Sequence, residues 1–133
     1  MSRHGRSSGP TSSTGRPAPR PIPGRGRVCG TVHGPGYCGD SGIAGELAAD
    51  ALLAEGFHAY AVHREPDRIR WFFDGTLYHT VTPAGLGGNP WVFDHDCYLL
   101  LNVAVGGTAS VPPDSSTPFP QTMLVDYVRV YAA

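Results

Sequence analysis

Apolar and polar residues alternate most clearly in the middle of the chain, over residues 68–73. Every second position there carries a large apolar side chain, namely Ile69, Trp71 and Phe73, while Arg68 and Arg70 lie on the other face. A period of two is typical of a β-strand with one buried face. Asp74-Gly75 follows and favours a type I′ turn, in which both central residues need positive φ. We therefore predict a β-hairpin whose second strand covers residues 76–82.

Most of the chain after residue 27 also favours strands. We predict further strands over residues 28–33, 58–64, 97–105 and 122–131, separated by loops over residues 34–45, 83–90 and 106–120. The stretch CYLLLNVAV (97–105) is almost entirely apolar, which is typical of a strand buried on both faces. Residues 122–131 are rich in β-branched and aromatic side chains. Short strands between turns indicate an all-β sandwich.

One stretch has a different local preference. Residues 46–55 (ELAADALLAE) have good helical propensity, and Gly56 is placed to act as a C-cap. We predict a short helix or turn there.

Residues 1–27 differ in composition from the rest. They contain six of the ten basic residues, all arginine, and no acidic residue, and they are rich in Ser, Gly and Pro. Such a segment buries too little apolar surface to offset its ordering entropy, so we expect a disordered arm. The folded unit is then one small domain over residues 28–133, near the lower size limit for a well-buried β-sandwich.

Charge and cysteine content narrow the functional classes. The net charge is −1, with the positive charge concentrated in the arm. An arginine-rich arm can touch nucleic acid or an anionic membrane, but no aromatics are interleaved with it, so we expect a solvated tail with neither partner. The arm lacks the apolar run of a secretion signal, and no run is long and apolar enough to span a membrane. Cys29 and Cys38 either close a loop or, together with Cys97, are unrelated thiols.

Six motifs resemble, in their order along the chain, one enzyme family. They are GFHAYAV (56–62), PDRIRWFFDG (66–75), GGNPW (87–91), LNVAVGG (101–107), FPQTM (119–123) and VDYVRVY (125–131). Together they resemble the C-terminal half of a glycoside hydrolase family 16 domain of the bacterial, laminarinase-like β-1,3-glucanase kind. The resemblance covers residues 30–131 and implies a partial concanavalin A-like jelly-roll β-sandwich. It also implies hydrolysis of β-1,3 or mixed β-1,3-1,4 glucans, with β-glucan as the partner and no required cofactor.

The implied reaction needs two carboxyl groups roughly 5–5.5 Å apart, one as nucleophile and one as general acid/base. The family supplies them from one strand in a Glu-x-Asp-x-x-Glu pattern, which occurs nowhere in the 133 residues. We expect the acidic pairs that do occur to be turn residues or solvated side chains and not catalytic pairs. They are Glu46 with Asp50, Glu65 with Asp67, and Asp94 with Asp96. We therefore predict no catalytic residue in this chain and a family member that is an inactive fragment.

The region just before residues 31–37, where the family places its catalytic strand, does not resemble the family. The chain has ten Arg and no Lys, which suggests a GC-rich coding sequence. The sharp boundary near Gly30 leads to the hypothesis that residues 1–27 come from a shifted reading frame or a wrong start. The family is usually secreted, whereas this chain shows no export signal, so its localisation stays open.

The remaining half of the substrate cleft also departs from the family pattern. His63-Arg64 stand where the family commonly has Glu-Trp, and residues 108–111 (TASV) stand where it has Asn-Trp-Pro-Gly. The second change removes a tryptophan on which a sugar ring stacks. We expect the two tryptophans of this chain, Trp71 and Trp91, to lie in the core and not to replace it.

Three residues match family positions of functional interest. His33 either hydrogen-bonds a sugar hydroxyl or is bonded to backbone at a strand end. Asn102 lies in an apolar strand and is either a sugar contact or a structural polar group that needs partners. Asp126 matches a ligand of the structural calcium found in some members, with the other ligands expected from the part of the domain that is missing here.

These observations leave three hypotheses of different classes. The chain is a non-catalytic fragment of a glucanase, a remnant that binds β-glucan without cutting it, or an enzyme completed by a second chain. Loss of the stacking tryptophan argues against tight glucan binding. Because half a sandwich exposes strand edges and an apolar face, self-association through those edges is also expected.

Overall fold

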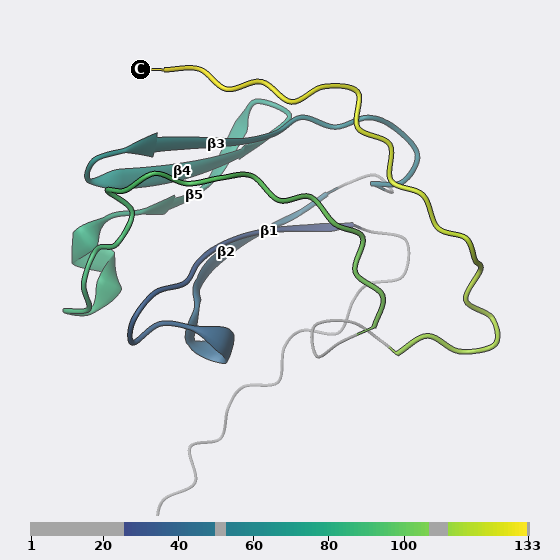
Figure 1. Cartoon of the computed structure of the whole chain (residues 1–133), viewed down its shortest axis with the longest axis horizontal. Helices are drawn as coiled ribbons and strands as arrows, with labels where there is room; N and C mark the ends of the chain where they lie inside the picture. The colour runs from purple at the N-terminus through teal and green to yellow at the C-terminus, as the bar shows by residue number, and fades with distance from the viewer. Residues whose placement is uncertain (1–25, 50–52, 107–111, 133) are drawn as a thin grey trace, which may run out of the picture.

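Two antiparallel sheets make up the regular structure (Figure 1). The computed structural model describes residues 26–49, 53–106 and 112–132. The first sheet pairs β1 (Arg27–Val32) with β2 (Ile43–Ala48). The second contains, in this order, β3 (Tyr60–Glu65), β4 (Arg68–Phe73) and β5 (Thr76–Val81). Short 3₁₀ turns at Gly39–Ser41 and Pro83–Leu86 are the helical elements of the described residues, none of which has the length and apolar content needed to cross a membrane. The all-β prediction is confirmed.

The predicted hairpin between β4 and β5 forms as the alternation indicated. Ile69, Trp71 and Phe73 are only 5%, 9% and 8% exposed, so they share the buried face. Asp74 and Gly75 adopt φ values of 47° and 79°, the left-handed conformation that a type I′ turn requires. Local sequence therefore determines this hairpin.

The two sheets pack face to face at two glycines. A Cβ at Gly30 in β1 would lie 2.7 Å from Cγ of Trp71 in β4, and a Cβ at Gly45 in β2 would collide with His79 in β5. β1 therefore lies over β4, and β2 lies over β5. The rings of Trp71 and His79 stack on each other with their centroids 4.9 Å apart.

The core is small and lies between the sheets. One cluster joins residues from both sheets, from the turn closed by the Gly34–Tyr37 bridge and from the Pro83–Leu86 turn. Its members are Val32, Tyr37, Ile69, Trp71, Val81 and Leu86, with Trp91 packed against them. A second cluster contains Val28, Ala49 and Phe73. Both tryptophans thus belong to the core or its margin, as predicted.

The helix or turn predicted over residues 46–55 is wrong for its first part. Residues 46–48 belong to β2, where Glu46 pairs with Cys29 and Leu47 with Val28 of β1. Pairing with a neighbouring strand overrides the local helical propensity. Residues 53–54 form a turn, and residues 50–52 lie outside the described part of the chain.

The strands predicted over residues 97–105 and 122–131 are also wrong. Both stretches run as extended chain without a ladder partner among the described residues, in green and in yellow in Figure 1. Leu99, Leu100 and Leu101 are 65%, 80% and 62% exposed, although their sequence predicted burial on both faces. A strand forms only when a neighbour supplies hydrogen bonds, and none of the described strands pairs with these stretches.

The arm predicted to be disordered, residues 1–27, falls almost entirely outside the described residues. Its last residue, Arg27, already opens β1, so the folded part begins one residue earlier than the predicted boundary at residue 28.

Candidate functional site

His33 lies directly after β1 and is exposed. Its imidazole sits above Gly42, where a Cβ would come within 2.8 Å of His33 Nδ1. Because glycine leaves that space free, the ring rests on the connection between β1 and β2. No hydrogen bond of this side chain to another described residue is found, so the imidazole is accessible to a ligand.

Asn102 and Asp126 lie on the two extended stretches that lack ladder partners, and both are exposed. The described residues contain no group of three His, Cys, Asp or Glu side chains that could hold a metal ion. The position of the lost stacking tryptophan, residues 108–111, falls outside the described part of the chain.

The acidic side chains make contacts other than with a second carboxylate. Glu65 Oε2 accepts hydrogen bonds from Arg68 Nε at 2.7 Å and from Arg70 Nη2 at 3.2 Å. The hydrogen bond from Arg68 is the main cause of a lowered pKa at Glu65. Glu46 pairs with Arg27 across the first sheet. A carboxylate held ionised by an arginine is a poor proton donor at neutral pH.

Asp74 is likewise held by its neighbours. The backbone N–H of Ala59 donates to Asp74 Oδ1 at 2.8 Å, and His58 Nδ1 lies 2.8 Å from Oδ2. These contacts keep the pKa of Asp74 below its ordinary value, with the Ala59 bond contributing most. The His58 ring also stacks on Phe73, with centroids 5.0 Å apart. The pair closes the β4–β5 turn against the start of β3, a contact that depends on folding and leaves no local signal in the sequence.

Arg64, one of the departures from the family pattern, ties a loop to β3. Its Nη1 donates to the carbonyl oxygen of Phe93 at 3.3 Å, to that of His95, and to Cys97 Sγ at 3.3 Å. One guanidinium therefore fixes the chain just before the apolar stretch that begins at Cys97. The substitution at this position has a structural role, which the motif comparison alone did not reveal.

An open groove lies between the sheets on the β3 side. It has a volume of about 390 Å³ and a largely apolar lining that comes from β1, the turn after β2, and all three strands of the second sheet. Its lining includes Val28, Cys29, Leu53, Tyr60, Val62 and Tyr78. Burial, with smaller contributions from Cys29 and Tyr60, raises the pKa of the Tyr78 hydroxyl. An apolar groove without a carboxylate offers contacts for binding and no group for hydrolysis.

Comparison with known proteins identifies the fold family. The family model for glycosyl hydrolases family 16 matches residues 24–126. A β-glucanase of Rhodothermus marinus is 36% identical over 115 residues, which are 78% of this chain and 39% of that protein. Glucan endo-1,3-β-glucosidase A1 of Niallia circulans is 36% identical over 122 residues, which are 80% of this chain and 18% of that protein.

A solved structure agrees with this match. The endo-β-1,3-glucanase from Pyrococcus furiosus superposes with a TM-score of 0.62 at 42% sequence identity, over 71% of this chain and 38% of that one. The fold is thus part of a jelly-roll β-sandwich, as the motifs predicted, and the chain spans less than two fifths of these relatives. Family 16 chemistry calls for no cofactor. On this evidence the chain belongs to glycosyl hydrolases family 16.

Proposed function

We propose that this chain is a β-glucan-directed part of a family 16 domain and that, by itself, it does not hydrolyse glucan. Its relatives are named as β-glucanase, endo-1,3-β-glucosidase and endo-1,3-1,4-β-glycanase, so the whole domain acts on β-1,3 or mixed β-1,3-1,4 linkages. The observation that carries the second half of the proposal is the absence of a Glu-x-Asp-x-x-Glu pattern from the 133 residues.

The reaction needs a nucleophile and a proton donor on opposite sides of one glycosidic bond. Removing either group costs several orders of magnitude in rate, and here both are missing together. The contacts of Glu65, Glu46 and Asp74 with arginine or histidine support their reading as structural carboxylates.

The direct experiment is release of reducing ends from laminarin and from a mixed-linkage β-glucan by the purified chain. We expect none above the blank, while the Rhodothermus marinus β-glucanase, assayed alongside, releases product. The variant D94N/D96N distinguishes a real activity from contamination, because these two exposed aspartates are the acidic pair that no described cation engages. Turnover by the chain that disappears in this variant would overturn the proposal.

Glucan binding without hydrolysis is the second candidate. A β-1,3-glucan-binding protein of Penaeus monodon is 37% identical over 79 residues, which shows that a named relative binds this polymer. His33 and Asn102 are both exposed and are the residues we propose to contact a sugar hydroxyl. Sedimentation with insoluble β-1,3-glucan tests this candidate. If it is right, H33A and N102A each reduce the bound fraction and H95A, a change at another exposed histidine, does not; equal retention of all four proteins removes these two residues from the proposal.

Two further expectations concern ions and partners. We propose that Asp126 contributes to a structural calcium site only when further oxygen ligands come from outside the described residues. We also propose that the chain associates with itself through its exposed strand edges, since an unpaired edge is a template for another strand.

A further inference from the structure

The first sheet is one strand too narrow to cover the second. β1 lies over β4 and β2 lies over β5, as the contacts of Gly30 and Gly45 show. β3 is therefore left without a covering strand, and β1 pairs only with β2 among the described strands. Its second edge, on the β3 side, is free to accept hydrogen bonds.

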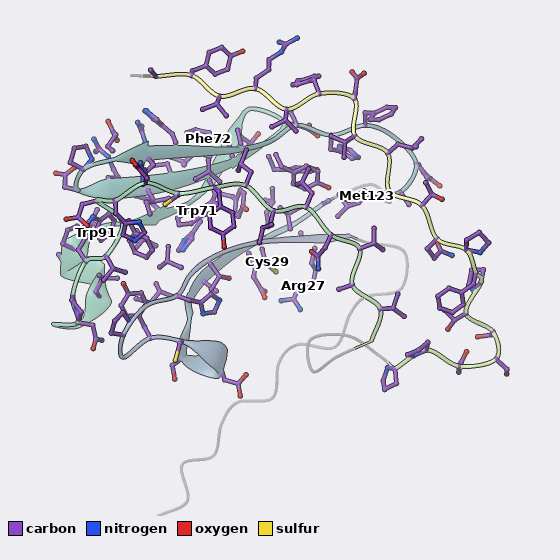
Figure 2. The ribbon with its side chains drawn as sticks, in the orientation of Figure 1. Arg27, Cys29, Trp71, Phe72, Trp91 and Met123 are labelled. Atoms are coloured by element: carbon purple, nitrogen blue, oxygen red, sulfur yellow. The ribbon has the colours of Figure 1, made fainter. Side chains whose placement is uncertain are left out.

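The uncovered residues of β3 belong to the buried face of their sheet. Val62 pairs with Trp71 and Tyr60 with Phe73, so these side chains point to the same side as the core residues of β4. Even so, Tyr60 and Val62 are each 61% exposed. They line the open groove described above, with Val28 of β1 on its opposite wall. Figure 2 shows Trp71 on one side of β1 and the side chains of Cys29 and Arg27 on the other, where Cys29 Sγ contacts Glu46.

The chain also contains a segment suited to this groove, Cys97–Val105. It is extended and makes no backbone hydrogen bond to the described residues. Alternation places five residues on one side, all apolar or a thiol: Cys97, Leu99, Leu101, Val103 and Val105. The other extended stretch fits less well, because one of its faces carries Asp126 and the other carries Arg129. Burial of either charge without a partner is costly.

We propose that a second copy of this chain inserts its segment Cys97–Val105 along the free edge of β1, and that the exchange is reciprocal. Acceptor and donor are both exposed parts of one molecule, so two copies satisfy each other about a two-fold axis. Leu99 and Leu101 then face Tyr60 and Val62, while Leu100 and Asn102 face solvent. The inference concerns the partner of the chain and does not depend on glucan.

The area involved is sufficient for a specific dimer. A strand of nine residues is about 30 Å long and, with its side chains, covers a band about 10 Å wide. Each of the two reciprocal contacts removes such a band from both partners, so roughly 1,200 Å² is buried, the lower end of the range for specific interfaces. Reciprocal exchange is thus required, because a single insertion buries only half of this area.

The first experiment is sedimentation velocity of the full 133-residue chain over a wide concentration range. We expect a reversible monomer–dimer equilibrium. L101K places a charge against Tyr60 and Val62 and should raise the dimer dissociation constant about 100-fold or more. L100K is the matched control, because it alters the neighbouring leucine on the solvent side of the same strand and should shift the constant less than about threefold.

Both leucines are exposed in the monomer, at 80% for Leu100 and 62% for Leu101, so neither variant should change the circular dichroism or thermal midpoint of the monomer. A mixture of unlabelled and ¹³C-labelled chains should then give isotope-filtered NMR contacts between Leu101 of one copy and the Tyr60 ring of the other.

Three results would each overturn the inference. The first is a monomer at every concentration. The second is equal loss of association in L100K and L101K, which indicates unspecific aggregation of apolar surface. The third is a Leu101–Tyr60 contact within single copies alone, which indicates that each molecule folds its own segment into its own groove. None of these results bears on glucan hydrolysis or glucan binding, which are measured separately.

Discussion

Replacement of Gly30 by alanine tests the packing of the two sheets. A Cβ at this position would lie 2.7 Å from Trp71 Cγ and 2.8 Å from Cδ1. Carbon atoms in good contact are about 3.5–4.0 Å apart, so the indole or β1 must move by roughly 1 Å. Overpacking of this kind costs about 1–3 kcal/mol, offset by about 0.5–1 kcal/mol because alanine loses less backbone entropy than glycine. We expect a net loss of about 1–2 kcal/mol in the free energy of unfolding.

That loss is large for so small a core. A domain of this size has a total stability on the order of 5 kcal/mol. The assay is urea denaturation followed by circular dichroism, in which G30A should lower the midpoint by about 1 M. G85A is the matched control, since a Cβ at Gly85 meets nothing within 4 Å.

A double-mutant cycle then assigns the cause. If the clash is with Trp71, G30A should cost about 1 kcal/mol less in a W71F background, because phenylalanine removes atoms from the indole that blocks the new methyl group. The reasoning is refuted if G30A is as stable as the original chain, or if W71F leaves the cost of G30A unchanged.

Three further predictions follow from the contacts of single residues. The pKa of Asp74 is lower in the folded chain than in the unfolded one. Its contribution to the free energy of unfolding is therefore complete above about pH 4 and is lost as the pH falls through the folded pKa. D74N should flatten the acid limb of the stability–pH profile, and an unchanged limb would contradict this role. Arg64→Ala should speed limited proteolysis within residues 93–97 without changing cleavage in β4, because the loop loses its anchor. Arg64→Lys should retain part of the resistance, whereas equal cleavage of all three proteins would rule out the anchoring role of the guanidinium. Calcium at millimolar concentration should leave the thermal midpoint of the chain within about 1 °C of its value in EDTA, because Asp126 has no companion ligands among the described residues; a larger rise would reveal a complete site.

The sequence predicted those elements whose stability is local. The β4–β5 hairpin needs only its own alternation and the Asp74-Gly75 turn, and it forms where expected. Residues 46–48 show the opposite case, since their helical propensity gives way to pairing with β1, a partner about twenty residues away that propensity does not register.

For the apolar stretch Cys97–Val105, the need for burial and the presence of a strand that provides it are two different things, and the sequence predicts only the first. Its apolar composition indicates that these side chains are more stable when buried. The composition does not indicate whether this chain contains a strand that buries them. Among the described residues, the side chains of this stretch lie exposed. The contacts of Arg64 and the His58–Asp74 pair were missed for a related reason, because each joins residues that only the folded register brings together.

The most direct test of the account is release of reducing ends from laminarin by the separated monomer and dimer fractions of the chain. Neither fraction should form product, because a second copy brings no Glu-x-Asp-x-x-Glu strand that the first copy lacks. Product formation by either fraction, at a rate that rises with protein concentration and is lost in D94N/D96N, would contradict it.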